Sequence, residues 1–312
     1  MEALRHDDPR RVGAYTVLAR FDADPETSAP ERAFVVRSGD GDTLLARLPR
    51  PGVDPARWAV EAEGARRLAV SGFLTVGEVG GGAGEPPWCA GPYVPALTLP
   101  AALRAHGGPL PDPVVRALGA ALARTLATAH AQGVTHAGLS PSAVLLTTDG
   151  PRLRCYGAVR AAAPDGERRD GLPGLDSGSL APEPAAGGRP QPPGDVYALG
   201  AVLAYAATGH TVPERDELPA FLREPVTACL SRDPDRRPQA HQLLMYLEQA
   251  AYEATPPVVT AAPTASPSPP ASAAAAPAPL PLPASVVVAL ARQSAEVLAA
   301  EPPLDASRTY HG

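Results

Sequence analysis

The segment from Gly194 to Gly209, GDVYALGAVLAYAATG, constrains the fold more than any other part of the chain. Its residues are apolar around nearly the whole circumference of a helix, so a helix formed here must be enclosed by other elements. It therefore belongs at the centre of a domain. A chain of 312 residues can supply that enclosure as one large domain, or a two-lobed one, with tails.

Two kinds of pattern surround this segment. Extended, strand-like runs come first, at residues 14–21, 32–37, 43–48, 73–79 and 88–94. A helix interrupts them over 54–70, with Asp54 as its N-cap and Pro55 at its first position. Helical periodicity then dominates, at residues 99–107, 112–133, 219–234 and 240–250. The sequence thus predicts a β-rich lobe followed by a helical lobe.

The C-terminal part has a different composition. Residues 255–283 are rich in Pro, Ala and Ser and too poor in large apolar groups to pack, which predicts a disordered tether. A short amphipathic helix is expected over 285–301, with Ser285 as N-cap and an apolar stripe at Val287, Leu290, Val297 and Leu298. Three fates stay open for it: fraying in water, docking on the chain's own body, or docking on a partner.

Composition excludes several classes of function. The net charge of -6 argues against binding nucleic acid, which requires a basic surface. The chain contains no Lys, Ile or Asn, and all 27 basic residues are Arg. Any mechanism that needs a lysine ammonium or an asparagine amide is therefore excluded.

The spacing of the cysteines and the length of the apolar runs indicate in which cellular compartment the protein is expected. Cys89, Cys155 and Cys229 lie far apart without metal-binding spacing, which favours free buried thiols in a reducing compartment. No secretory signal is visible, and no apolar run reaches the ~18 residues of a membrane span. We expect a cytoplasmic protein with no membrane span.

Residues 134–146, VTHAGLSPSAVLL, have the layout of a catalytic loop between a helix and an apolar strand. Their polar side chains are limited to one histidine, one threonine and two serines. The loop therefore keeps a shape while lacking the charged groups that such loops use.

Four sequence words occur in a characteristic order: WCAGPYVP, LAPE, GDVYALGAVLAYAATG and SRDPDRRP. With the loop above, they resemble a bacterial, actinobacterial-type serine/threonine protein kinase domain over residues 13–250. The resemblance implies an α+β, bilobal protein-kinase-like fold followed by a disordered Pro/Ala-rich tail. The implied parts are a flexible N-terminus (1–12), an N-lobe with hinge (13–95), a helical C-lobe (96–252), a Pro/Ala-rich linker (253–284), a short helix (285–301) and a tail (302–312).

Part of the resemblance concerns architecture. Glu183 and Arg237 match an ion pair between the activation segment and the last helices, and Asp195 matches an aspartate that accepts hydrogen bonds from the catalytic-loop backbone. His136 and Tyr156 match two positions of the regulatory spine. Glu61 matches the helix glutamate that pairs with the phosphate-binding lysine, here Arg47, so an Arg47–Glu61 pair is expected.

Other positions depart from the family pattern. The chain has Arg47 where the resemblance places the phosphate-binding lysine, and Gly138 where it places the acceptor-orienting aspartate. It has Ser140 in place of the catalytic-loop lysine, Ala143 in place of the metal-binding asparagine and Cys155 in place of the metal-binding aspartate. Arginine does not replace lysine conservatively, and a thiol is a poor ligand for Mg²⁺. The turn that covers the phosphates in the family has no glycine here and carries four carboxylates, at Asp22, Asp24, Glu26 and Glu31.

The adenine pocket is expected to survive only as a remnant, formed by Leu45, Gly91, Tyr93, Val94 and Leu145. Leu45 should partly fill it, whereas Gly91, at the gatekeeper position, should enlarge its back. We therefore expect ATP binding to be weak or absent, and no Mg²⁺ or other metal site.

The expected function is a pseudokinase, which is not an enzyme and acts as a scaffold or regulator bound to an unknown protein partner, such as an active kinase. The alternative is an enzyme of the family with unusual ATP binding or altered transferase chemistry, and a third reading is a decaying paralogue. A lesser hypothesis is a Cys155 nucleophile activated by His136. Segment 174–179, GLDSGS, looks like a hydrolase elbow but lacks the G-x-S-x-G pattern and a preceding strand, so the resemblance implies a remnant of the substrate-docking loop, with Asp176 where the family carries threonine.

Overall fold

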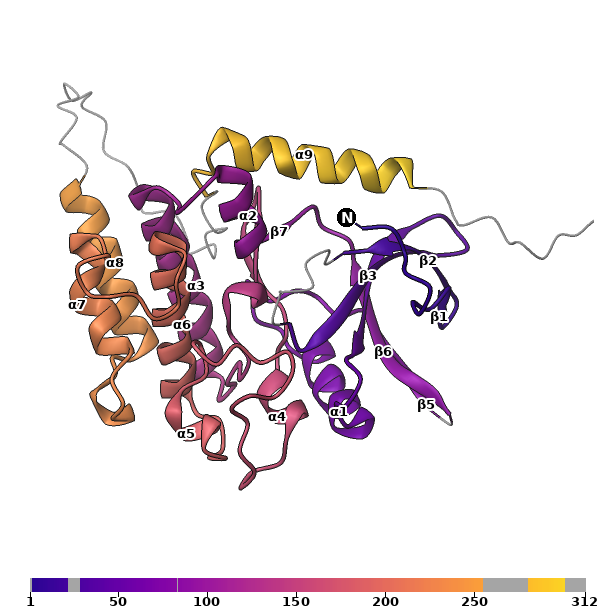
Figure 1. Cartoon of the computed structure of the whole chain (residues 1–312), viewed down its shortest axis with the longest axis horizontal. Coiled ribbons are helices and arrows are strands. Elements are labelled where there is room, and N and C mark those ends of the chain that lie inside the picture. Colours follow the sequence, from indigo (N-terminus) through magenta and orange to yellow (C-terminus); the bar gives the residue numbers. More distant parts are fainter. Residues whose placement is uncertain (1, 22–28, 83, 255–279, 301–312) are drawn as a thin grey trace, which may run out of the picture.

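The structure is a computed structural model that describes residues 2–21, 29–82, 84–254 and 280–300. It has two lobes, a β-sheet lobe and a helical lobe, with a long C-terminal helix lying across both (Figure 1). The predicted bilobal, protein-kinase-like α+β fold is confirmed. Most of the predicted linker, residues 255–279, and the predicted tail after residue 300 lie outside the described residues.

The smaller lobe is built on one antiparallel sheet with the order β1-β2-β3-β4-β6-β5. Its strands are β1 Arg11–Val12, β2 Tyr15–Arg20, β3 Glu31–Arg37, β4 Thr43–Pro49, β5 Glu78–Gly82 and β6 Glu85–Pro92. Alternation along β3 and β4 gives the sheet two apolar faces. Phe34 and Ala46 pack with Trp88 on one face, whereas Val35 and Leu45 face the helical lobe.

Helix α1 (Pro55–Arg66) packs beside this sheet. Its N-cap is Asp54, as predicted, and the carboxylate accepts hydrogen bonds from the backbone N–H groups of Ala56 and Arg57 at 2.8 and 3.3 Å. The predicted strand over 73–79 is wrong in its first half. Phe73 instead forms a bridge with Leu153 of the helical lobe, and strand pairing in the sheet begins only at Glu78.

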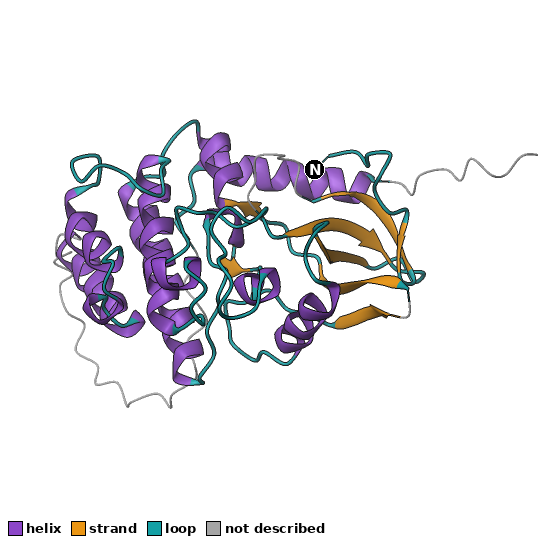
Figure 2. Ribbon diagram, turned by 60° about the horizontal axis from the view of Figure 1, so that its bottom comes forward, coloured by secondary structure: helices purple, strands orange, loops and turns teal. Residues whose placement is uncertain are grey.

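The larger lobe surrounds α6 (Pro192–Thr208), whose residues Leu199, Val202 and Leu203 are completely buried. The other helices are α2 Leu99–His106, α3 Asp112–Ala131, α4 Ala158–Ala162, α5 Pro182–Ala185, α7 Ala220–Cys229 and α8 Ala240–Ala254. A small sheet, β7 (Leu97–Thr98), β8 (Val144–Thr147) and β9 (Gly150–Leu153), lies against the other lobe (Figure 2). The enclosure demanded by the apolar segment is therefore supplied by α3, α7 and the loops.

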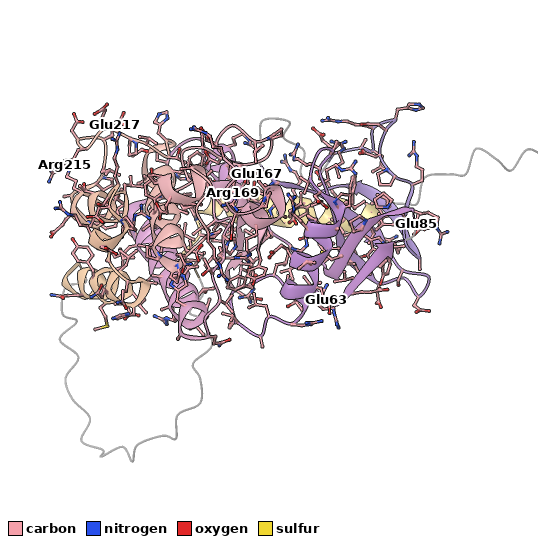
Figure 3. The ribbon with its side chains drawn as sticks, turned by 90° about the horizontal axis from the view of Figure 1, so that it is seen from below. Glu63, Glu85, Glu167, Arg169, Arg215 and Glu217 are labelled. Atoms are coloured by element: carbon pink, nitrogen blue, oxygen red, sulfur yellow. The ribbon has the colours of Figure 1, made fainter. Side chains whose placement is uncertain are left out.

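Charged side chains are mostly on the surface, such as Glu63 and Glu85 on the sheet lobe and Arg215 and Glu217 at the far end of the helical lobe (Figure 3). Arg169 is a buried exception. Its guanidinium donates to the backbone carbonyls of Ala163 and Gly188 at 3.0 and 2.6 Å. It thereby links the two ends of the irregular segment between α4 and α6, residues 163–188.

Helix α9 (Ala284–Ala299) begins one residue before the expected position, and its N-cap is Pro283 instead of Ser285. The buried face consists of Val286, Leu290, Gln293 and Val297, so the expected stripe is correct at only two positions. Val287 and Leu298 are 44% and 81% exposed. The expected stripe missed Gln293, because a pattern of apolar residues cannot show that a polar residue lies on the buried face of the helix.

The Glu183–Arg237 ion pair joins the end of the irregular segment to the last helices. Arg237 is fully buried, and its Nη2 donates to Glu183 Oε2 at 2.8 Å while Nη1 donates to the Pro193 carbonyl at 3.0 Å. We predict that Glu183→Ala lowers the free energy of unfolding by about 3 kcal/mol, because it leaves a buried guanidinium without its anion. Chemical denaturation measures this loss.

Glu248→Ala is the matched control, because its partner Arg124 and Glu248 itself are about half exposed. Exposed pairs contribute roughly 0–1 kcal/mol, so this variant should unfold almost like the parent chain. Equal losses in the two variants would contradict the importance of the buried pair.

Candidate active site

The loop that connects α3 to β8 is held by α6. Asp195 Oδ2 accepts the backbone N–H of His136 at 2.7 Å, and Oδ1 accepts that of Ala137 at 2.9 Å. His130 Nε2 lies 3.0 Å from the same carboxylate. Ala137 has a φ of 52°, which costs a residue with a Cβ about 1–3 kcal/mol and is characteristic of functional loops. The carboxylate therefore stabilises a loop shape that the loop's own sequence disfavours.

An aromatic cluster forms around this loop. The rings of His136, Phe73 and Tyr156 are in mutual contact: the His136 centroid is 5.4 Å from that of Phe73 and 6.4 Å from that of Tyr156, and the latter two are 6.1 Å apart. His136 is fully buried, and burial lowers its pKa to about 4. A neutral, enclosed imidazole of this kind serves packing, and neither ring nitrogen of His136 has a hydrogen-bond partner within the described residues, so the hypothesis that His136 activates a nucleophile gains no support. Sequence analysis missed Phe73.

Gly138 occupies the place of the acceptor-orienting aspartate, and the surrounding backbone has closed over it. A Cβ at this position would lie 2.5 Å from the Cys155 carbonyl oxygen and 2.7 Å from the Ala158 Cβ. Ala143, Cys155 and Ala158 form a small buried apolar cluster next to it. This corner of the site therefore has no room for a side chain at residue 138.

The buried charges of the site are paired differently from expectation. Arg47 Nη1 lies 3.7 Å from Glu31 Oε1, and both side chains are nearly inaccessible. Glu61 instead accepts from Arg160 Nε at 3.0 Å, and Arg160 stacks on the Tyr156 ring at 5.0 Å. The expected Arg47–Glu61 pair is therefore wrong, because α4 brings a nearer cation to Glu61 and β3 brings a nearer anion to Arg47.

Glu31 reaches the centre of the site from the start of β3. Its Oε1 also lies 3.6 Å from the Cys155 thiol, so it sits between the phosphate-binding and metal-binding positions of the family. Pro30 beside it contacts the irregular segment, since a Cβ on Gly174 would lie 2.7 Å from the Pro30 Cα. The sheet lobe and the segment around Gly174 are thus in contact at this point. Asp22, Asp24 and Glu26 lie outside the described residues.

The adenine-pocket residues lie between the lobes. Leu45 and Leu145 are buried in one cluster with Tyr93, and Val94 is half-buried. Burial, reinforced by Glu296, raises the pKa of Tyr93 to about 12. Gly91 does not open the back of the pocket as expected, because the Thr75 carbonyl oxygen would lie 2.1 Å from a Cβ there.

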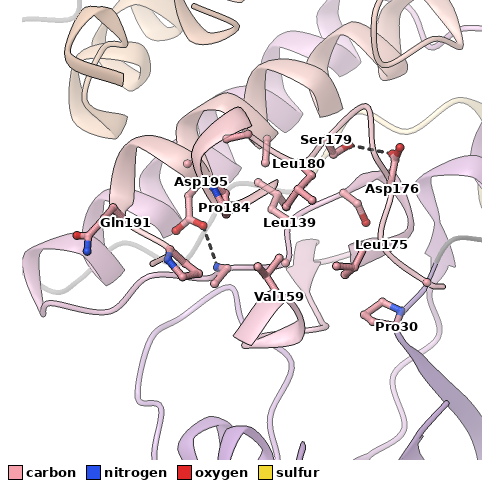
Figure 4. Close-up of a pocket in the computed structure, with 18 residues that line it drawn as sticks. Pro30, Leu139, Val159, Leu175, Asp176, Ser179, Leu180, Pro184, Gln191 and Asp195 are labelled. Atoms are coloured by element: carbon pink, nitrogen blue, oxygen red, sulfur yellow. Dashed lines mark hydrogen bonds between the residues drawn. The ribbon is translucent and has the colours of Figure 1, made fainter. Parts of the chain in front are cut away.

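A pocket lies beside the loop, between residues 137–140, the segment 174–181 and α6 (Figure 4). Ser140 is buried on its wall and shares a hydrogen bond of 3.0 Å with Ser142. Asp176 faces it from the opposite segment, where its Oδ2 accepts from Ser179 Oγ at 2.9 Å and its Oδ1 from the Gly178 N–H at 3.0 Å. Segment 174–179 is therefore a wall of this pocket, and no strand precedes it as a hydrolase elbow requires.

Comparison with known proteins places this site in a family. No family model matches the chain. It is 34% identical over 270 residues to a probable serine/threonine-protein kinase, PkwA, of Thermomonospora curvata, covering 79% of this chain and 35% of that protein. It is 31% identical to the serine/threonine-protein kinase AfsK of Streptomyces coelicolor, covering 78% and 32%. The chain spans about a third of the length of these curated relatives.

A solved structure agrees in fold. The crystal structure of the Mycobacterium tuberculosis PknI kinase domain matches with a TM-score of 0.58 at 21% identity, over 77% of this chain and 97% of that one. The chain described here therefore carries a domain of the bacterial serine/threonine protein kinase family.

Two predictions are overturned by these relatives. The prediction that the chain is not an enzyme is wrong, since relatives that are 34% and 31% identical to it over 79% and 78% of its length are named serine/threonine-protein kinases. The prediction of no Mg²⁺ site and little or no ATP binding falls with it, because kinases of this family imply both. The substitutions do not by themselves establish a loss of activity.

The side chains at the family's two metal-binding positions do not fit a magnesium ion. Ala143 has no ligand atom, and the Cys155 sulfur is a soft donor, whereas Mg²⁺ requires oxygen. Among the described residues, no group of three histidine, cysteine or acidic side chains is placed to hold a metal. No step is therefore assigned to a metal at these positions. Within the same residues, no helix is long and apolar enough to cross a membrane.

The closed space at Gly138 yields a stability test. We predict that Gly138→Ala costs about 1–3 kcal/mol, because the Cys155 carbonyl and α4 must move to admit one methyl group. Gly39→Ala is the control, since nothing lies within 4 Å of a Cβ there. Thermal unfolding of both variants measures the difference, and a neutral Gly138→Ala would mean that the loop is not tightly packed.

His136 yields a test against pH. Its pKa is about 4 in the folded chain and close to 6.5 when unfolded, so the unfolded chain binds the extra proton first as pH falls. Stability should therefore decline as pH falls from 6.5 toward 4. We predict that His136→Phe flattens this decline, measured by denaturation at several pH values, whereas replacement of the exposed His241 by Phe leaves it in place.

Proposed function

We propose that this domain is a nucleotide-binding phosphotransferase of the serine/threonine protein kinase family that works with a rearranged set of charged side chains. The observation that carries the proposal is the state of Arg47. Its side chain is buried and its Nη2 has no hydrogen-bond partner within the described part of the chain. An unmet buried donor of this kind costs about 1–3 kcal/mol, and a phosphate oxygen would satisfy it.

Glu31 supports the same proposal, because its carboxylate occupies the site beside Arg47 that we assign to a phosphate group. Its carboxylate is buried beside Arg47, in the position where an anionic phosphate would sit, and Glu31 is the first residue of β3. Exchange of one anion for another leaves the buried cation neutralised throughout. Binding of a nucleotide therefore requires that the Glu31 carboxylate move away from the Arg47 guanidinium.

Asp176 supports the proposal that this site also binds the hydroxyl group that accepts the phosphate. It shares a pocket with Gly138 and Ser140, where the family orients the acceptor hydroxyl, and each of its oxygens retains a free lone pair. In the proposed reaction the acceptor oxygen attacks the γ-phosphorus, the bond to the β-phosphate oxygen breaks, and ADP leaves. The hydroxyl proton passes to the Asp176 carboxylate.

The more specific sequence-based reading, a scaffold acting on an unknown protein partner, is the result that would remain if no nucleotide bound and no phosphate were transferred. A location in the cytoplasm stays a prediction.

The test uses ATP binding by the full chain, with and without Mg²⁺ or Mn²⁺, together with transfer of label from [γ-³²P]ATP. We predict that Arg47→Leu weakens ATP binding roughly 10-fold or more, since one charge-assisted contact is lost. Glu31→Gln should strengthen binding, because the competing carboxylate is gone. Arg57→Leu, on the exposed side of α1, should change neither.

Opposite responses of the Arg47 and Glu31 variants cannot arise from misfolding alone. If both variants bind ATP like the parent chain, Arg47 is not the phosphate contact. If no form transfers phosphate under any metal condition, the domain is not a phosphotransferase.

A further inference from the structure

Helix α9 packs against both lobes at once. Its first half belongs to the helical lobe, where Val286 and Leu290 join the main core together with Leu280, which precedes the helix, and the helix runs beside α2. At this end Ser285 Oγ lies 3.3 Å from His106 Nδ1. Figure 1 shows the helix continuing from there over the sheet lobe. The question of where this helix docks is thus answered: it docks on the chain's own body.

The second half of α9 enters the adenine end of the cleft. Val297 is 2% exposed and belongs to the cluster formed by Leu45, Leu145 and the cleft-facing residues of β2 and β3. These two leucines come from opposite lobes and are the walls of the adenine-pocket remnant. An apolar side chain of this chain therefore lies in the cluster into which an adenine ring would have to insert.

Polar contacts fix the helix in this position. Gln293 is buried, and its Oε1 accepts the backbone N–H of Ala96 at 3.2 Å, just after the connection between the lobes. Arg37 Nη1 donates to the Ala300 carbonyl at 3.1 Å, which places a cation at the negative end of the helix. The helix thus uses an apolar insertion and a backbone hydrogen bond near the hinge, the two kinds of contact that a purine makes in such a cleft.

We propose that α9 is a built-in competitor of the purine nucleotide, and that nucleotide binds only after the second half of α9 leaves the cleft. This inference rests on the proposed nucleotide-binding function. The first half, anchored in the helical lobe, stays in place, so the released half remains close and returns when the nucleotide leaves. Apparent affinity for nucleotide is then lowered by the fraction of molecules in which α9 is docked.

The test compares two neighbouring positions of the full chain, Val297→Asp on the buried face and Leu298→Asp on the exposed face. Hydrogen–deuterium exchange over residues 293–300 reports docking of the helix, and equilibrium dialysis with ATP, with and without Mg²⁺, reports the cleft. We expect Val297→Asp to accelerate exchange and to tighten ATP binding roughly 10-fold or more, the equivalent of one buried valine. Leu298→Asp should alter neither.

Each other outcome has a defined meaning. Faster exchange with unchanged ATP affinity overturns the competition while the proposed function stands. Faster exchange in a chain that still binds no ATP counts against nucleotide binding itself, and hence against both. If a Val297→Asp, Gln293→Ala double variant exchanges as slowly as the parent chain, these contacts do not hold the helix and the inference fails. Saturating ATP should also accelerate exchange of residues 293–300 in the parent chain.

Discussion

The hydrogen bonds that Asp195 accepts from the backbone of His136 and Ala137 are the interaction on which the site depends. They join the central helix, which is fixed by its burial, to a loop whose backbone is strained at Ala137. With the loop held, His136 packs in one aromatic cluster with Phe73 and Tyr156, and the two lobes acquire a defined relation. A carboxylate buried at the start of α6 thus transmits the rigidity of the core to the cleft.

Charge balance explains the arrangement around that cleft. A buried guanidinium requires an anion nearby, and Arg47 finds Glu31, while Glu61 pairs with Arg160 from α4. Two other departures from the family pattern are accompanied by a local rearrangement: the space of a missing side chain is closed at Gly138, and the Cys155 thiol lies against Glu31. In the described structure the cleft is filled by groups of the chain itself, including Val297. This filled conformation of the cleft is compatible with the chain's protein kinase relatives.

Sequence reasoning was accurate where one local pattern dominated. The Asp54 cap, the buried helix and the order of strands and helices follow from periodicity and capping, which act over a few residues. It failed where two distant segments compete for one partner. The expected Arg47–Glu61 pair ignored Arg160, about a hundred residues away, and the expected opening at Gly91 ignored the carbonyl of Thr75. The stripe of α9 was misjudged because a buried glutamine carries no apolar signal.

The amino-acid sequence by itself determined the two-lobed architecture, the absence of lysine and asparagine chemistry, and the identity of the residues at each family position. These depend on composition and on short-range patterns that any folded form must respect. Only the tertiary structure decided which anion neutralises Arg47, whether space beside a glycine is open, and where α9 binds. Such outcomes depend on distances between groups far apart in the chain, because buried charges and backbone donors pair with whichever partner the fold brings within reach.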